Sequence, residues 1–347
     1  MVASSLRTSR RPTCHPARDA RPPPRPEVFE AYWSFALERQ RIFEARLSDR
    51  VGPWTDDPIL ATHRFCNTFR ASDRVSQDLI RVAYESPSSG PPDLFVRVVL
   101  HRLFSRPTTW RLLDVAAGGL TAATFDPDAL GAVLDEAHAA GEKLYTGAFI
   151  LCANRAFGHA RKHRNHLALV QGMLEDGVPA RIEATPSFKG IYDELRQWPL
   201  LGPFMAYQLA IDLNYTTIVD FDEDEFTVPG PGALRGLRKV FVDLGGLTLP
   251  QAVHWLVRYQ ERVEEELGIE PPRLFGRRLK AIDCQNLLCE VDKYSRVRFP
   301  ELRSNRNRIK QRFTPDPTRL DLFYPPKWGI NAAAAAARHA IPRAQVG

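Results

Sequence analysis

Apolar side chains recur every three or four residues along most of this chain, and this spacing predicts helices rather than strands. The rhythm is clearest in residues 27–47 and in residues 251–268, which end at a glycine. A further helix is expected over residues 127–144, because Asp126 is a typical N-cap residue and Pro127 suits the first helical position. Proline and glycine clusters separate these segments. We therefore expect an all-α fold.

One helical segment carries an unusual polar face. Read as a helix, residues 65–81 place hydrogen-bonding side chains at alternating steps of three and four, with Asp73 beside them. Arginine binds carboxylates or phosphates, and glutamine and asparagine combine a donor with an acceptor, so this face is a candidate recognition surface. A buried structural network between helices is an equal alternative. The side chains of the face are Asn67, Arg70, Arg74, Gln77 and Arg81.

The two ends of the chain differ from its body. Residues 1–26 contain six prolines and six arginines against one acidic residue, and we expect a disordered tail there. An organelle transit segment is the alternative for this stretch. We expect one helical domain over residues 27–330 and a low-complexity, frayed tail over residues 331–347.

The composition predicts a soluble intracellular protein, in the cytoplasm or the nucleus. It is 44% hydrophobic and 25% charged, and no apolar run approaches the ~18 residues of a membrane span. The net charge is +6, but residues 1–26 supply most of it, so a nucleic-acid role must rest on local clusters. The five cysteines lack the paired spacing of a zinc site, and we expect reduced thiols.

A helix, a short turn and a second helix are expected between residues 191 and 219. The turn ends at Gly202 and Pro203, and it leaves the first backbone amides of the second helix free for a ligand such as a DNA phosphate. The turn resembles the Leu-Pro-Gly-Val-Gly turn of helix–hairpin–helix DNA glycosylases. That turn has two glycines, and this chain has only one of them, Gly202. We predict that Gly202 lies at the DNA.

An acidic run follows at residues 220–225. Asp220 comes eighteen residues after Gly202, roughly where these glycosylases carry a catalytic aspartate. Five acidic residues around one short apolar run are able to bind Mg²⁺ or to raise the pKa of one carboxyl. We select Asp220 and Asp222 as candidate general bases or Mg²⁺ ligands; a solvated acidic loop is the alternative.

Two further segments collect cations. Gly230 and Gly232 flank the start of a helix whose first turns carry Arg235, which predicts an anion site; a simple turn is the alternative. Residues 293–312 hold eight basic residues against one acidic residue, which predicts a DNA-binding arm rather than a charged arm without this role. The residues selected in the arm are Arg303, Arg306 and Arg308.

Four motifs occur in a fixed order between residues 60 and 315. They are Asn67-x-x-Arg70-x-x-Asp73-Arg74-x-Ser76-Gln77, the run from Gly202 to Gln208, the run from Phe226 to Ala233, and Asp283-Cys284-Gln285-Asn286 followed by Glu290 to Tyr294. Together they resemble the α-glutamyl/putrescinyl-thymine pyrophosphorylase group. This group also includes proteins described as the 5-hydroxymethyluracil DNA kinase helical domain and as amino-acid:DNA transferases.

The resemblance implies an all-helical enzyme, related to helix–hairpin–helix DNA glycosylases, that acts on thymine-derived bases in DNA. In such pathways a hydroxymethyluracil is activated as a phosphate or pyrophosphate ester, and an amine or amino acid displaces the leaving group. The kinase step belongs to a P-loop enzyme. This chain has no GxxxxGK[ST] sequence, so we expect a separate kinase as partner. A glycosylase and a non-catalytic DNA-binding module are the alternatives.

In a displacement the DNA base must first leave the stacked duplex. Cations or backbone amides then stabilise the leaving phosphate, and a carboxylate orients or deprotonates the amine. We expect Asp73, Arg74, Asp220 and Asp222 to be catalytic, with Asp73 orienting an arginine. The residues expected to bind the base or its phosphate are Asn67, Arg70, Gln77, Tyr207, Gln208, Gly230, Gly232, Arg235, Asp283, Asn286 and Lys293.

Overall fold

The computed structural model describes residues 21–47, 52–85, 88, 90–146, 155–302, 304–314 and 321–339. Within these ranges every regular element is a helix, which confirms the predicted all-α class. The first half contains α1 (Pro26–Leu47), α2 (Pro58–Thr62), η1 (Arg70–Ser72), α3 (Arg74–Glu85), α4 (Pro91–Phe104), α5 (Pro107–Ala116), α6 (Pro127–Ala139) and α7 (Lys162–Glu175). The second half contains α8 (Val178–Glu183), α9 (Phe188–Arg196), α10 (Pro203–Asn214), α11 (Pro231–Val240), α12 (Leu249–Tyr259), α13 (Val263–Leu267), α14 (Ala281–Arg298), η2 (Pro326–Trp328) and α15 (Asn331–His339).

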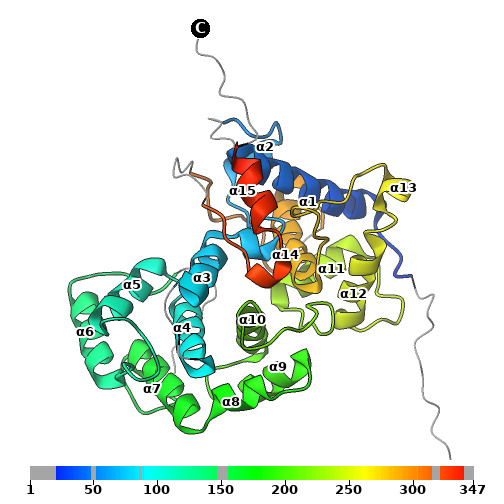
Figure 1. The fold of residues 1–347 in the computed structure, drawn as a ribbon. Coiled ribbons are helices and arrows are strands. Elements are labelled where there is room, and N and C mark those ends of the chain that lie inside the picture. Colours follow the sequence, from blue (N-terminus) through cyan, green and yellow to red (C-terminus); the bar gives the residue numbers. More distant parts are fainter. Residues whose placement is uncertain are drawn as a thin grey trace, which may run out of the picture.

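The helices form two groups with α10 between them. In Figure 1, α4 to α8 gather on one side and α1 with α11 to α14 on the other. Helix α10 packs against α4 and α9, and residues 205–214 are all buried. A helix surrounded in this way must satisfy its polar side chains internally, which matters for the residues it carries.

Helix α1 confirms the apolar rhythm predicted for residues 27–47. It buries Tyr32 and Trp33 and packs against α11 and α14. Trp33 lies edge-on to Tyr32, with ring centroids 5.0 Å apart. The hydroxyl of Tyr32 donates to the carbonyl of Cys284 on α14 at 3.3 Å, which fixes α1 against α14 and gives the polar side chains on its remaining face defined positions.

Helices α11 and α14 approach each other closely because α11 has glycine at the contact. A Cβ atom on Gly236 would lie 2.1 Å from the carbonyl oxygen of Leu288, and one on Gly232 would lie 2.7 Å from Cys289 Sγ. Real Cβ contacts are longer than 3 Å, so a side chain at Gly236 would displace the backbone of α14, and one at Gly232 would displace the side chain of Cys289. Gly232 therefore has a packing role that its sequence motif did not reveal.

The predicted helix–turn–helix is confirmed as α9, a turn and α10. The left-handed backbone position of this turn belongs to Leu200, with φ of 72°, and not to Gly202, whose φ is −64°. A Cβ atom on Gly202 would meet nothing within 4 Å. The turn therefore differs from the glycosylase turn in the residue that adopts the left-handed conformation. The relation to the glycosylase fold stays a prediction.

The predicted single helix over residues 65–81 is wrong. Residues 64–69 are irregular, η1 follows, and α3 begins only at Arg74. The N–H of Asn67 donates to Asp73 Oδ1 at 2.8 Å, and the N–H of Arg70 donates to Asp283 Oδ1 at 2.8 Å. Because side-chain carboxylates satisfy these amides, the segment has no need of helical hydrogen bonds. The expected polar face is consequently split between two places.

Three smaller expectations also need correction. Residues 251–268 form two helices, α12 and α13, although the predicted end at Gly268 is confirmed by its φ of 65°. Residues 331–339 form α15 instead of fraying. Residues 21–25 are ordered, since the N–H of Arg25 donates to the carbonyl of Val240 at 2.8 Å. The rest of the predicted N-terminal tail lies outside the described residues.

None of the helices in the described ranges is long and apolar enough to cross a bilayer.

Candidate functional site

Arg70 belongs to a buried interior network and not to a surface. Its side chain is 1% exposed; Nη2 contacts Asp212 Oδ1 at 2.8 Å, and Nε donates to Gln208 Oε1 at 3.0 Å. Arg102 from α4 binds the same carboxylate, with Nη2 3.0 Å from Oδ1. Burial opposes ionisation of Asp212, but Arg102 and Arg70 overcome it and lower its pKa. For Arg70, the structural-network alternative describes the geometry.

Asp283 extends this interior network from the first turn of α14. Its carboxylate accepts the N–H groups of Arg70 at 2.8 Å and Lys280 at 3.0 Å. Burial raises the pKa of Asp283 to about 6. We use the name interior network for Arg70, Arg102, Gln208, Asp212 and Asp283.

Several buried amides around the interior network are incompletely satisfied. Among the described residues, Gln208 Nε2 and Gln285 Nε2 have no hydrogen-bond partner, and the hydroxyl of Tyr207 has none of good geometry. Burial also raises the pKa of nearby Glu223 to about 7, although Arg277 pairs with it. The sequence did not single out Gln285 or Glu223, because burial is what distinguishes them from neighbouring polar residues.

A second cluster lies nearer the surface, where α1, the irregular segment and α14 meet. Arg39 Nη2 donates to Asn67 Oδ1 at 3.0 Å, and the N–H of Asn67 donates to Asp73. Lys293 Nζ pairs with Glu290 Oε2 at 2.7 Å. We name Arg39, Asn67, Asp73, Glu290 and Lys293 the Asp73 cluster.

Asp73 is the half-buried carboxylate of this cluster. Burial raises its pKa to about 6; the N–H of Asn67 opposes this increase, and the charge of Glu290 adds to it. In the described part of the chain Asp73 makes no ion pair, so no cation holds it ionised directly. A carboxyl with a pKa near 6 and access to solvent is suited to accept a proton at neutral pH.

The other residues of the predicted polar face have separate surroundings. Arg74 is exposed at the first position of α3. Gln77 is buried and holds backbone, since Nε2 donates to the carbonyl of Ala71 at 2.7 Å and Oε1 accepts the N–H of Phe323 at 2.8 Å. Gln77 therefore holds η1 against the C-terminal segment, and both ends of its side-chain amide are used in these structural contacts.

The acidic run is neutralised by basic residues. Asp220 pairs with Lys327 at 3.2 Å, and Asp222 pairs with Lys280 at 2.7 Å, with both carboxylates largely exposed. No group of three or more histidine, cysteine or acidic side chains in the described ranges is arranged to hold a metal ion. With lysine ammonium groups in place of further oxygen ligands, Asp220 and Asp222 do not fit a Mg²⁺ site.

The predicted anion site at α11 is occupied by protein contacts. Arg235 Nε donates to Asp292 Oδ2 at 2.9 Å, and Asp292 is fully buried. A Cβ atom on Gly230 would lie 2.9 Å from the ring of Phe204. The glycines thus serve close packing, and Arg235 serves a buried carboxylate.

The remaining predicted residues are dispersed. Gly202 is exposed at the start of α10, and Asn286 is half-buried on α14. Arg306 and Arg308 are exposed in the basic arm, and Arg303 lies outside the described residues.

Two members of the Asp73 cluster were missed from the sequence. Arg39 occupies a polar position of a helix that attracted notice only for its apolar rhythm. Glu290 stands in a quoted motif, and its spacing of three from Lys293 on one helix face was the available signal.

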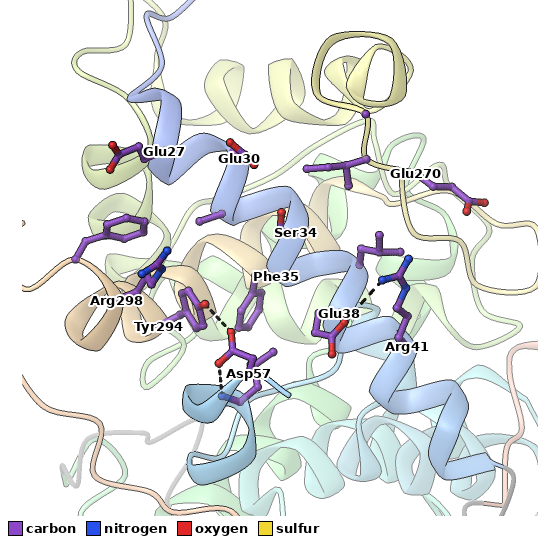
Figure 2. Close-up of a pocket in the computed structure, with 16 residues that line it drawn as sticks. Glu27, Glu30, Ser34, Phe35, Glu38, Arg41, Asp57, Glu270, Tyr294 and Arg298 are labelled. Carbon is purple, nitrogen blue, oxygen red and sulfur yellow. Dashed lines mark hydrogen bonds and ion pairs between the residues drawn. The ribbon is translucent and has the colours of Figure 1, made fainter. Parts of the chain in front are cut away.

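One pocket of the described residues lies away from both clusters. It has a volume of about 710 Å³, and none of its lining residues was predicted as a site. Figure 2 shows that Tyr294 points toward Asp57, whose Oδ2 accepts the tyrosine hydroxyl at 2.6 Å. Asp57 also caps α2 through the N–H of Ile59. These contacts are structural, so we do not select this pocket as the reaction site.

Comparison with known families supplies what the geometry does not. The model of the family described as "5-hmdU DNA kinase, helical domain" matches residues 26–304. The chain belongs to this family. The match includes both the interior network and the Asp73 cluster.

One curated relative of this family member is the 5-hmdU DNA kinase of Bacillus phage SP10. It is 27% identical over 290 residues, which cover 77% of this chain and 45% of the relative. The chain therefore corresponds to less than half the length of that relative. No solved structure matches the chain.

Proposed function

We propose that this chain modifies 5-hydroxymethyluracil-derived bases in DNA, with an amine displacing the phosphate or pyrophosphate of an activated base. Membership of the 5-hmdU DNA kinase helical-domain family is the observation that carries this proposal. The name of the phage relative, a 5-hmdU DNA kinase, supports the choice of base. This sequence has no GxxxxGK[ST] motif, so the proposal does not assign ATP-dependent phosphorylation to it.

The Asp73 cluster is the proposed reaction site. The amine nitrogen attacks the exocyclic methylene carbon of the base, a C–N bond forms, and the C–O bond to the phosphate breaks. The amine must lose one proton, and Asp73 accepts it because its pKa of about 6 leaves it mostly ionised above neutral pH. The phosphate departs with the bonding electrons.

Cations near Asp73 serve the leaving group. Arg74 follows Asp73 in the chain and is exposed, and Lys293 lies across the cluster on α14. A cation that meets the growing negative charge of the phosphate lowers the barrier to its departure. Arg70 acts as a positioning residue in this proposal, because its N–H bond to Asp283 holds the segment that presents Asp73.

Mass spectrometry of DNA bases tests the proposal. Duplexes containing thymine, hydroxymethyluracil or its phosphate ester are incubated with the protein, with and without Mg²⁺ and with a panel of amines. An amine adduct formed only from the ester supports the proposal. Abasic sites would indicate a glycosylase instead, and binding without a product would indicate a DNA-binding module.

A further inference from the structure

The basic arm was predicted over residues 293–312, but residues 293–298 belong to α14. The segment beyond this helix is docked on the protein, and we use the name arm for residues 304–314. The N–H of Arg64 donates to the carbonyl of Gln311 at 3.1 Å, and the N–H of Phe313 donates to the carbonyl of Thr62 at 2.9 Å. A bridge joins His63 and Arg312 between these bonds. The arm is therefore paired with the residues that lead directly into the Asp73 cluster.

Side chains fasten the arm at two more points. Phe313 lies edge-on to Trp54, with ring centroids 6.0 Å apart, and the guanidinium of Arg46 lies 5.4 Å from the Trp54 ring centroid. Arg296 Nη1 from α14 donates to the carbonyl of Arg308 at 3.1 Å. The arm consequently has a fixed position between the end of α1 and the end of α14.

This arrangement gathers like charges on one face. The arm cations are exposed, and within the described ranges neither they nor Arg64 make an ion pair. Arg74 borders the same surface, because burial and then repulsion by Arg46 and Arg64 lower the pKa of its guanidinium. The cationic face consists of Arg46, Arg64, Arg74, Arg306, Arg308, Lys310 and Arg312.

The cationic face concentrates positive charge in a chain that is nearly neutral outside residues 1–26. Repulsion among them costs stability unless a polyanion binds, and planar guanidinium groups match phosphate oxygens. The face also borders the Asp73 cluster, because Lys293 Nζ donates to the carbonyl of Arg64 at 3.1 Å. An anion along this face would lie next to the proposed reaction site.

We infer that the cationic face binds the phosphate backbone of DNA and leads the strand to the Asp73 cluster. The choice of DNA as the polyanion rests on the proposed function. The sequence motif located cations only in the arm, whereas the structure adds Arg46, Arg64 and Arg74 from three other segments to the same surface.

The salt dependence of DNA binding tests this inference. Arg64→Ala combined with Arg312→Ala removes two exposed side chains but leaves the backbone pairing intact. On a short unmodified duplex, the slope of log K against log salt should fall by about 1.8, because each phosphate contact contributes about 0.9. Fluorescence anisotropy over a salt series gives this slope.

A matched control removes the same charge elsewhere. Arg161→Ala with Arg258→Ala deletes two exposed arginines from the region of α7 and α12, and it should leave the slope unchanged. If the first pair fails to fold, Arg308→Ala with Lys310→Ala replaces it. An unchanged slope in the face variants, or an equal loss in the control, would overturn the inference.

The binding assay is independent of the chemistry. A reduced salt slope without any amine adduct would support DNA binding by the cationic face and would contradict the proposed reaction. Adduct formation with an unchanged slope would retain the reaction and reject the face.

Discussion

The interior network and the Asp73 cluster use the same kinds of residue in opposite ways. Asp212 is fully buried and directly paired with two arginines, and its pKa is lowered. Asp73 is half-buried and has no ion-pair partner in the described ranges, and its pKa is raised. The comparison teaches that pairing decides whether a carboxylate stabilises a fold or remains available for proton transfer.

The largest expected effect is on the interior network. Asp212→Ala leaves Arg70 and Arg102 buried without their shared carboxylate, and breaking such a contact costs about 3–5 kcal/mol. Equilibrium unfolding in urea should show this loss of free energy. A loss below about 1 kcal/mol would mean that the network is not structural.

The next effect separates the Asp73 cluster from the network. Asp73→Asn keeps an oxygen that accepts the N–H of Asn67, but it removes the proton acceptor, so turnover should fall about 10²–10⁴-fold. Adduct formation followed by mass spectrometry gives the rate, and circular dichroism should remain that of the unaltered protein. Retained turnover would exclude Asp73 as the base.

The pH dependence sharpens the same assignment. Adduct formation should decline as the pH falls through about 6, because Asp73 becomes protonated. A folded-state pKa raised above the usual 3.8 means that stability is lost as the pH rises from about 4 through about 6. Asp73→Asn should therefore raise the melting temperature by up to about 4 °C at neutral pH. This difference should vanish below pH 4, and a difference that persists there would contradict the titration.

The smallest effect is expected in the acidic run. Asp220→Asn removes one exposed ion pair with Lys327, and such pairs contribute at most about 1 kcal/mol to the free energy of unfolding. Because Asp220 lies outside the proposed reaction site, the rate of adduct formation should remain close to that of the unaltered protein. A hundredfold loss would transfer the catalytic role from Asp73 to Asp220.

The sequence predicted the fold class and most helices because apolar spacing and proline caps are local signals. It failed at residues 65–81, where Asp73 and Asp283 take the place of helical carbonyls as hydrogen-bond acceptors. Asp283 is more than two hundred residues away from Arg70 in the chain. No periodicity within the segment reveals an acceptor at that separation.

The candidate site was predictable to a similar extent. Motif order placed Asp73, Asn67 and Lys293 in one set, and the structure brings them together. The acidic run attracted attention through its density of charge, but the lysines that neutralise it come from elsewhere in the chain. Arg39 was missed because an isolated arginine in an amphipathic helix has no local mark.

Gly236 sets the distance between α11 and α14, because its backbone lies directly against that of Leu288. Leu288, the residue it faces, is two positions from Glu290 on α14, so a methyl group at position 236 would push this part of the helix outward. Glu290 and Lys293 would then shift together relative to Asp73. Variants that alter the geometry of the proposed reaction site are therefore expected at Gly236, a residue that has no side chain and lies outside the Asp73 cluster.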